Sequence, residues 1–213
     1  MPNIILSLTI ICLISGIALS AANKYTANAI AATKEAELKN AIQNVTPEFD
    51  NNPLEEAYTI DVTEKDFLTV YQARKGGQFV GCAVVSYSKQ GFSGLIRVLV
   101  GFDAEGKVFN YSVLEHNETP GLGSKMEVWF RQNRNRQNVI GRDMTEGMLR
   151  LTKDRGDIDA ITAATISSRA FLDAINIAYF GLMGNLDAIS GPTQAAENVL
   201  NNETVGDINN ETD

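Results

Sequence analysis

An uncharged and strongly apolar segment opens this chain, and it constrains the fold more than any other feature. Residues 1–23 contain no charged side chain, and Ile4 to Ala22 form a nearly unbroken apolar run of 19 residues. Because a helix rises about 1.5 Å per residue, the run reaches roughly 28 Å, close to the thickness of the hydrocarbon core of a bilayer. Core helices of soluble proteins are rarely apolar on every face. We therefore expect residues 1–23 to form a transmembrane anchor.

A cleaved signal peptide is the main alternative to a retained anchor. The residues before the run carry no basic side chain, and the run is longer than the usual apolar core of a signal peptide. Small residues near the end of the run are compatible with cleavage: Ala18, Ser20 and Ala22. The length of the run favours the retained anchor.

Basic residues and cysteines say less about topology and compartment. Three lysines follow the run and none precedes it: Lys24, Lys34 and Lys39. By the usual excess of basic residues on the cytoplasmic side, this count places the rest of the chain weakly in the cytoplasm. Cys12 lies within the apolar run and Cys82 lies outside it, so we expect no disulfide between them within one chain.

Charge and residue counts exclude several functions. The chain holds 18 Lys and Arg against 26 Asp and Glu, a net charge of -8, whereas nucleic-acid binding needs a clustered positive field. One histidine, His116, and two cysteines cannot assemble a zinc finger, a Cys-ligated iron–sulfur cluster or a c-type haem site. Any redox chemistry must therefore come from an organic cofactor.

Beyond the anchor, residue patterns predict an α+β domain. Apolar residues recur at helical spacing over 24–46, and a turn-rich segment follows at 47–53. Segments rich in β-branched and aromatic residues come next, separated by connections of hairpin length. They are Phe67–Ala73, Gln78–Tyr87, Leu95–Phe102 and Val108–Leu114. We expect them to form an antiparallel sheet with helices packed on it.

Further elements are predicted in the C-terminal half. Met148–Thr152 is expected to add a strand, and Met126–Asn133 a short helix. A longer helix begins near Thr165 and stops near Gly181, and its apolar stripe is Ile166, Ala170, Phe171, Ala174, Ile175, Ala178 and Tyr179. The acidic chain after Gly191 is expected to be disordered. The predicted divisions are the anchor at 1–23, a membrane-proximal helix and linker at 24–52, the main domain at 53–190 and the tail at 191–213.

One segment rich in glycine carries residues that point to chemistry. It runs from His116 to Lys125 and reads HNETPGLGSK. Its glycines and proline let the backbone approach a ligand closely, with N–H groups available for an anion. It lacks the spacing of the nucleotide-binding P-loop, and Met126 stands where the dinucleotide-binding fingerprint needs its third glycine. A tight turn after a strand is the alternative, with His116 as a structural residue that orients the loop.

The second such segment, from Asp159 to Ser168, reads DAITAATISS and leads into the last helix. Hydroxyl side chains surround the start of that helix: Thr162, Thr165, Ser167 and Ser168. Ser and Thr commonly cap helices at such positions. A helix N-terminus also favours a phosphate through its free N–H groups and its dipole. A hydroxyl there either holds a phosphate non-covalently or is esterified by it, and composition leaves both alternatives open.

Taken together, the segments ETPGLG over 118–123 and DAITAATISS over 159–168 resemble the FMN-binding domain family. Members of this family include the G subunit of the Rnf ion-translocating ferredoxin:NAD oxidoreductase and the C subunit of the Na⁺-translocating NADH:quinone reductase. The resemblance covers nearly the whole chain, including the N-terminal span and the segment GLIRVLVGFDAEG over 94–106. The compact size of the chain favours the first of these two proteins.

The resemblance implies that FMN is joined by a phosphoester bond to Thr165, and that Asp159 is the acidic residue required by a dedicated flavin transferase. It implies that the 118–123 loop lines the isoalloxazine ring, and that Lys125 or Lys153 helps to neutralise the phosphate. Family members generally carry Gly where this chain has Ala163, and a positive φ there would cost about 1 kcal/mol. The residues expected at the cofactor are Glu118, Thr119, Gly121, Leu122, Gly123, Lys125, Thr162, Ala163, Ala164, Thr165, Ser167 and Ser168.

The resemblance further implies an electron carrier that needs no general base. The family places its flavin domain on the periplasmic side of the bacterial inner membrane, opposite to the lysine count. Its partners would be the other subunits of the Rnf-type complex, which carry flavin and iron–sulfur centres, and the flavin transferase. The alternatives are the C subunit of the quinone reductase, a free-standing extracytoplasmic flavin relay, and a non-catalytic membrane scaffold.

Overall fold

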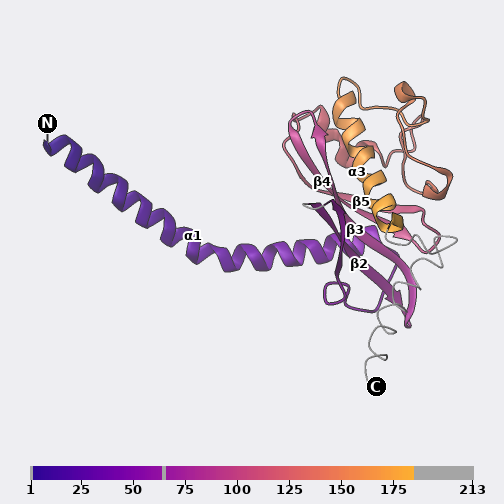
Figure 1. Cartoon of the computed structure of the whole chain (residues 1–213), viewed down its shortest axis with the longest axis horizontal. Coiled ribbons are helices and arrows are strands. Elements are labelled where there is room, and N and C mark those ends of the chain that lie inside the picture. Colours follow the sequence, from indigo (N-terminus) through magenta and orange to yellow (C-terminus); the bar gives the residue numbers. More distant parts are fainter. Residues whose placement is uncertain (1, 64–65, 185–213) are drawn as a thin grey trace, which may run out of the picture. The chain divides into compact units, whose positions relative to one another are not determined.

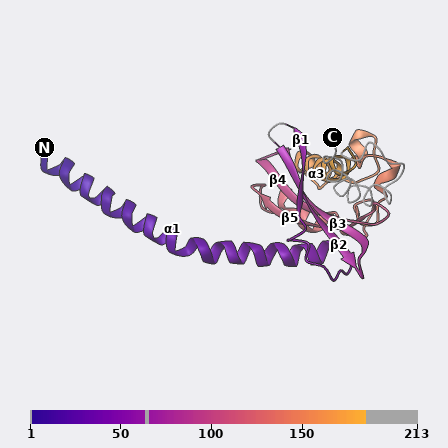
Figure 2. The same cartoon turned by 60° about the horizontal axis from the view of Figure 1, so that its bottom comes forward.

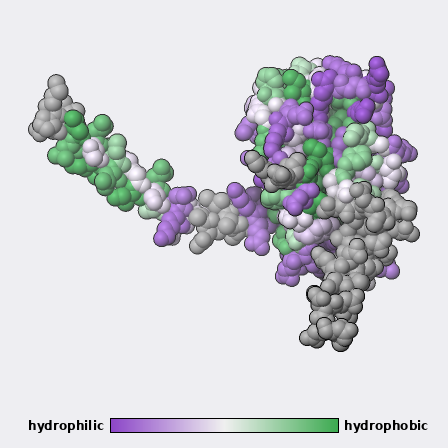
Figure 3. All heavy atoms as spheres, in the orientation of Figure 1, coloured by the Kyte–Doolittle hydropathy of each residue, from purple (hydrophilic) through white to green (hydrophobic). Residues whose placement is uncertain are grey.

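The computed structural model describes residues 2–63 and 66–184, so the predicted tail lies outside the described residues. The chain divides into two compact units, one up to Asn40 and one from Ala41 onward. Helix α1, Pro2–Val45, runs through the first unit and ends in the second, which confirms the predicted helix over 24–46. Its segment Ile5–Thr26 is long and apolar enough to cross a membrane, and Figure 3 shows the apolar surface of this helix in green.

Among the described residues, antiparallel strands form one sheet in sequence order. They are β1 (Tyr58–Thr63), β2 (Asp66–Lys75), β3 (Gln78–Gly91), β4 (Gly94–Asp103) and β5 (Val108–His116). Figures 1 and 2 show this sheet from two directions, together with the long helix α3, which spans residues 165–184. The predicted α+β class and antiparallel sheet are confirmed.

Strand β1 is not among the strands predicted from the sequence. It is an edge strand that pairs with β2, with Tyr58 opposite Val70 and Thr63 opposite Asp66. Ile60 is buried, whereas Val62 is 39% exposed. A short edge strand that is half exposed carries a weak hydrophobic pattern, and for this reason the sequence does not reveal it.

Helix α3 packs against the sheet and encloses the core. The Ser86 hydroxyl on β3 donates a hydrogen bond to the Ala174 carbonyl at 2.7 Å, and the Ser88 hydroxyl donates one to the Asp173 carboxylate at 2.8 Å. Most of the predicted apolar stripe of α3 is buried: Ala170, Phe171, Ala174, Ile175, Ala178 and Tyr179. The exception is Ile166 in the first turn, which is 48% exposed.

The strand predicted at Met148–Thr152 does not form, and its one β-type pairing among the described residues is an isolated parallel bridge between Leu151 and Ile158. Leu149 and Leu151 are buried in alternation, as a strand requires, but they join no strand of the described sheet. The side chain of Asn176 in α3 takes the place of a strand partner. Its Oδ1 accepts a hydrogen bond from the Leu149 N–H at 2.9 Å, and its Nδ2 donates one to the Leu149 carbonyl at 3.0 Å.

The helix predicted at Met126–Asn133 is shorter in the structure. Helix α2 spans Met126–Trp129 and follows a 3₁₀ turn at Gly123–Lys125. The Phe130 carbonyl accepts a hydrogen bond from the Val139 N–H at 2.9 Å. After α2, the N–H groups of Arg131 and Gln132 bond to carbonyls only three residues back, those of Val128 and Trp129, so the α-helical ladder does not continue.

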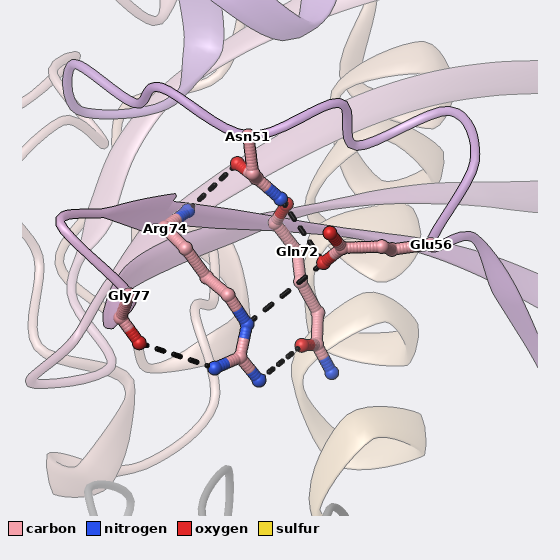
Figure 4. A network of polar contacts seen from close by, with 5 residues as sticks. All are labelled: Asn51, Glu56, Gln72, Arg74 and Gly77. Atoms are coloured by element: carbon pink, nitrogen blue, oxygen red, sulfur yellow. Dashed lines mark hydrogen bonds and ion pairs between the residues drawn. The ribbon is translucent and has the colours of Figure 1, made fainter.

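A polar network joins the turn-rich segment after α1 to strand β2, as Figure 4 shows. The Asn51 side chain acts as a strand partner, because its Oδ1 accepts from the Arg74 N–H at 2.9 Å and its Nδ2 donates to the Gln72 carbonyl at 3.0 Å. The Arg74 guanidinium donates to Gln72 Oε1 at 3.1 Å and lies 3.8 Å from Glu56. These contacts cover the part of the β2 edge that extends beyond its pairing with β1.

Candidate functional site

A cavity of 330 Å³ lies where three separate segments of the chain meet. These segments are the turn between β3 and β4, the loop after β5, and the start of α3. The residues that line it are Phe92, Glu118, Thr119, Leu122, Gly123, Ala163, Ala164, Thr165, Ile166 and Ser167. The fold therefore brings together the two sequence segments that point to chemistry, although they lie far apart in the chain.

The Glu118 carboxylate joins these three segments. Its Oε1 accepts a hydrogen bond from the Ser93 N–H in the β3–β4 turn at 3.0 Å, and its Oε2 accepts one from the Ser167 hydroxyl in α3 at 2.6 Å. Glu118 is 5% exposed and Ser167 is 2% exposed. A hydrogen bond to a charged group contributes about 1.5–3 kcal/mol. The carboxylate therefore fixes the walls of the cavity relative to one another.

The structure requires glycine near Glu118 for two separate reasons, lack of space and a left-handed backbone. A Cβ on Gly123 would lie 2.5 Å from Ser167 Oγ and 2.6 Å from Glu118 Oε2, and a Cβ on Gly91 would lie 2.7 Å from Glu118 Oε1. Gly121 has open surroundings, but its φ is +76°. Gly91 and Gly123 thus leave space for the carboxylate, whereas Gly121 supplies a left-handed backbone.

His116 orients the loop from the end of β5, in agreement with the expectation from the sequence. Its Nδ1 accepts a hydrogen bond from the Glu118 N–H at 3.2 Å, and its Nε2 lies 3.2 Å from Glu127 Oε1. Because Nδ1 accepts, the hydrogen-bond pattern assigns the proton of the neutral ring to Nε2, which donates to Glu127. The ring lies outside the cavity lining.

The backbone just before α3 is left-handed at Ala163, where φ is 61°. An L-residue other than Gly in this region costs about 1–2 kcal/mol. The conformation closes a tight turn in which the Ala164 N–H donates to the Ile161 carbonyl at 3.0 Å. The sequence predicts strain if Ala163, which stands where family members carry Gly, has a positive φ. The structure shows that Ala163 has such a φ.

Two of the hydroxyls near the start of α3 are committed to acceptors within the protein. A hydroxyl has one hydrogen to donate. Ser167 donates its hydrogen to Glu118, and Ser168 donates its hydrogen to the Ala164 carbonyl at 2.8 Å. Ser168 also accepts from the Ile161 N–H at 2.9 Å and is fully buried outside the cavity lining.

Thr165 is the hydroxyl that remains on the cavity wall. It is the first residue of α3 and is partly buried, whereas Thr162 is exposed and outside the lining. Lys153 Nζ lies 3.1 Å from Thr165 Oγ1. The first turn of α3 contains no acidic residue, so the helix N–H groups and Lys153 create a positive potential beside this hydroxyl.

The carboxylate next to Lys153 in the sequence is already paired elsewhere. Asp154 accepts two hydrogen bonds from the Arg169 guanidinium, at 2.7 and 2.8 Å. The hydrogen bond from Arg169 holds the pKa of Asp154 below its ordinary value. Arg169 thus supplies the hydrogen bonds to this carboxylate, whereas the Lys153 ammonium donates to Thr165 Oγ1.

Asp159 and Lys125 lie outside the cavity lining. The Asp159 carboxylate accepts from the Arg136 N–H at 3.3 Å and lies 3.8 Å from the Arg136 guanidinium. The Asp159 carbonyl accepts from the Trp129 indole N–H at 3.0 Å. Asp159 thus anchors the segment that leads into α3. Lys125 is exposed at the end of its 3₁₀ turn, so the structure places Lys153 rather than Lys125 at the start of α3.

Phe92 and Ile166 line the cavity but are not predicted from the sequence as site residues. Phe92 lies at the tip of the β3–β4 hairpin, between Gly91 and Gly94, and is 68% exposed. An aromatic residue in a turn that normally favours Gly, Asn, Asp or Ser is the signal that could have identified it. Ile166 continues the helical spacing of the core residues, and that spacing does not distinguish a core position from a cavity wall.

The chemistry of the cavity suits an organic ligand with an anionic end. Within residues 2–63 and 66–184, no group of three or more His, Cys, Asp or Glu side chains is arranged to hold a metal ion. Apolar side chains from Phe92, Leu122 and Ile166 contribute to the walls, and Thr165 with Lys153 marks the positive end. This combination of apolar walls with a few placed polar groups is typical of cofactor sites.

Comparisons with known proteins agree with this site. The FMN-binding domain family model matches residues 91–179. The G subunit of the ion-translocating oxidoreductase complex of Yersinia pestis is 35% identical over 162 residues, which cover 72% of this chain and 76% of that protein. The G subunit of Stutzerimonas stutzeri is 30% identical over 179 residues, which cover 80% of this chain and 75% of that protein. Among solved structures, NqrC of Shewanella oneidensis has a TM-score of 0.42 at 21% identity, covering 60% of this chain and 68% of that chain, which is too low to carry an assignment.

The matched range contains all three segments that form the cavity, so the fold and the site define an FMN-binding domain. The identity to the G subunits extends over most of both chains. The chain belongs to the G-subunit family of ion-translocating oxidoreductase complexes.

Proposed function

We propose that this chain is an electron-carrying subunit of a membrane-bound, ion-translocating oxidoreductase complex of the Rnf type, with FMN joined to Thr165 by a phosphoester bond. The relatives named as G subunits of such a complex support the assignment to a complex, whose other subunits are then its partners. The FMN-binding domain match supports the cofactor. Helix α1 supplies a segment, Ile5–Thr26, that is suited to anchor the chain in the membrane.

The observation that carries the attachment site is the disposition of the hydroxyls at the start of α3. Ser167 and Ser168 donate their hydrogens to protein acceptors. Thr162 lies outside the cavity lining, and Thr165 lies on the cavity wall. Of the two alternatives that composition leaves open, this arrangement favours esterification at one hydroxyl over a phosphate held by several of them.

The residues around Thr165 fit a phosphate ester. Attachment forms a bond between Thr165 Oγ1 and the phosphorus of an activated flavin phosphate anhydride, and it releases the hydroxyl proton and the leaving phosphate group of the donor. The diester keeps one negative charge. Lys153, whose Nζ lies 3.1 Å from Oγ1, and the free N–H groups of the first turn of α3 stabilise that charge.

The remaining walls position the ring. FMN, when bound, supplies one- or two-electron transfer. Leu122 is 40% exposed and offers an apolar contact, while Glu118 keeps the loop that carries it in place. The cavity of 330 Å³ is at the lower end of the roughly 300–1,000 Å³ usual for ligand pockets. We propose that a flat three-ring system fixed at Thr165 keeps an edge at the mouth, where a partner protein of the complex can exchange electrons with it.

We also propose that the FMN-binding domain lies outside the cytoplasm, as the family resemblance implies. The three lysines that follow the apolar segment count against this orientation, but they are interspersed with acidic residues. A C-terminal fusion to alkaline phosphatase, which folds into an active enzyme only outside the cytoplasm, should be active in cells. An inactive phosphatase fusion together with a fluorescent cytoplasmic reporter fusion would reverse the orientation.

For the flavin transferase, we propose that Asp159 is the acidic residue it requires. Its side chain is 29% exposed and is held by Arg136, so it presents a fixed charge six positions before the acceptor hydroxyl. An Asp159→Asn variant keeps the shape and the oxygen acceptor. It should fold normally and lose most of its covalent flavin, and normal loading of this variant would disprove the requirement.

The direct test of the proposed function is the intact mass of the full chain produced together with its flavin transferase. We expect one added FMN, located on the peptide that contains Thr165. On a denaturing gel, the Thr165→Val variant should show no flavin fluorescence, and Thr165→Ser should retain it because a hydroxyl remains. The Thr162→Val variant serves as the matched control, since it removes a neighbouring hydroxyl that does not line the cavity.

Two results would overturn the proposal. One is native, active material whose 165 peptide carries no flavin. The other is a Thr165→Val variant that keeps its covalent flavin or transfers electrons within the assembled complex as well as the native chain. Loss of assembly in Thr165→Val, with no activity tied to flavin in the native chain, would favour the scaffold alternative.

A further inference from the structure

The turn between β3 and β4 places a large aromatic side chain at the mouth of the cavity. Gly91 pairs with Gly94, so Phe92 and Ser93 form the tip of the hairpin. Phe92 lines the cavity, yet it is 68% exposed. Leu122 and Ile166, which line the same cavity, are also large, apolar and partly exposed, at 40% and 48%.

The turn itself does not need an aromatic residue at this position. Two-residue hairpin turns favour small or polar residues that adopt the required backbone conformations. The hydrophobic core does not use Phe92 either, because most of its surface is open. An aromatic side chain can bury about 150–250 Å² when it finds a partner. Phe92 therefore has surface to bury against a ligand in the cavity.

The support under Phe92 is rigid. The next residue, Ser93, donates its N–H to Glu118 Oε1 at 3.0 Å, and the other oxygen of that carboxylate is held by Ser167 at 2.6 Å. Gly91 packs so closely that a Cβ there would lie 2.7 Å from Glu118 Oε1. The same buried carboxylate thus fixes the backbone that carries Phe92 and the helix turn that carries Thr165.

We propose that Phe92 packs against the isoalloxazine ring of FMN attached at Thr165, and that Leu122 and Ile166 form the opposite side of the slot. This inference rests on the proposed function and adds a cofactor-contact residue to it. The contact holds the ring against one wall and shields one part of it from water, while the edge at the mouth stays open.

A tryptophan substitution tests the contact through the light emission of the flavin. An indole ring in contact with a flavin quenches its emission by electron donation to the excited ring, and this process requires near van der Waals distance. The full chain is produced with its transferase, and intact mass verifies one FMN in each variant. We expect Phe92→Trp to lose most of its native flavin emission relative to the unmodified chain. The matched control is Phe67→Trp, because Phe67 is 58% exposed on β2 and outside this cavity.

A second variant measures the shielding. Phe92→Ala should raise the Stern–Volmer constant for quenching of flavin emission by iodide, and Phe67→Ala should leave it unchanged. Because Phe92 is 68% exposed in the chain without flavin, neither substitution at 92 should shift the urea midpoint of the chain produced without the transferase. Wild-type emission in Phe92→Trp, or unchanged iodide quenching in Phe92→Ala, would overturn the contact while FMN remains attached. Absence of FMN from the unmodified chain is a separate readout and would count against the proposed function instead.

Discussion

Gly121 and Gly123 in the loop after β5 resist substitution for different reasons, one because of its backbone conformation and the other because of lack of space. This difference gives a quantitative test of the site. Gly123 lacks space: a Cβ there would lie 2.5 Å from Ser167 Oγ, 2.6 Å from Glu118 Oε2 and 2.9 Å from Glu118 Cβ. Gly121 has nothing within 4 Å of the same position, but its φ is +76°. A third glycine, Gly184 in α3, has open space and no positive φ.

The expected costs follow from these contacts. In Gly123→Ala, both oxygens must withdraw to ordinary contact distance, and this separates a hydrogen-bonded pair that is 2.6 Å apart. Loss of a buried hydrogen bond to a charged group and overpacking together cost about 3–5 kcal/mol. In Gly121→Ala, a left-handed backbone cost of about 1–2 kcal/mol is partly offset by the lower entropy of the unfolded chain, which leaves about 1 kcal/mol. Gly184→Ala should be neutral or slightly stabilising.

Urea unfolding of the full chain in detergent measures this order. The sole tryptophan, Trp129, is a suitable probe because its indole N–H bonds to the Asp159 carbonyl at 3.0 Å near the site. Gly123→Ala should also lose flavin attachment, since the start of α3 shifts with Ser167. If Gly123→Ala unfolds within about 1 kcal/mol of the unmodified chain, or if Gly121→Ala is the more damaging change, the reasoning about space around Glu118 is refuted.

Three further predictions concern single residues. Ala163→Gly should leave stability equal or raise it by up to about 1 kcal/mol, because relief of the left-handed strain outweighs the entropy of Gly, and urea unfolding that shows a loss of stability would contradict the strain. Lys153→Gln should slow covalent flavin loading in a gel time course, while its matched control, Lys125→Gln, loads normally. Equal loading rates for the two variants would show that the Lys153 ammonium does not assist attachment at Thr165. Burial raises the pKa of the Cys82 thiol from 9.0 to about 12. As the pH rises, the thiol of the unfolded chain therefore loses its proton before the thiol of the folded chain. The free energy of unfolding should fall as the pH rises above about 9. Near pH 8 a thiol reagent should modify Cys82 only after unfolding, and rapid modification of the native chain would show that this thiol is not buried.

The sequence predicts most of the sheet because its turns and its apolar runs agree. Hairpin connections separate the strands from β2 to β5, and each strand has enough β-branched and aromatic residues to be recognised. Strand β1 is missed because it is a short edge strand with exposed positions. Met148–Thr152 shows the opposite error: Leu149 and Leu151 alternate as a strand does, but a side-chain amide of α3 satisfies the Leu149 backbone. Alternating apolar residues therefore predict which side chains are buried, but they do not predict which group forms hydrogen bonds with the backbone.

At the site, sequence patterns identify residue types and leave their partners open. The motifs around 118–123 and 159–168 predict which segments approach a ligand, and the structure brings both to one cavity. The pattern treats the hydroxyls near α3 as equivalent. Tertiary contacts distinguish them, because the acceptor for Ser167 comes from a loop 49 residues earlier. In the same way, Phe92 lines the site because the pairing of β3 with β4 places their turn there, and neither motif includes these strands.

The charges near the start of α3 explain why these partners matter. The proposed phosphate ester at Thr165 would be negative, as the Glu118 carboxylate is. Both groups would lie at the first turn of one helix, since Thr165 is its first residue and Ser167, the partner of Glu118, is its third. Two such charges 4 Å apart would repel by about 4 kcal/mol at an effective dielectric constant near 20. The fold gives each its own donors: the Ser93 N–H and the Ser167 hydroxyl serve Glu118, and Lys153 lies beside Thr165. The Ser167 hydroxyl would therefore contribute to the proposed phosphate site indirectly, because it stabilises the carboxylate that would otherwise compete for the positive end of the helix.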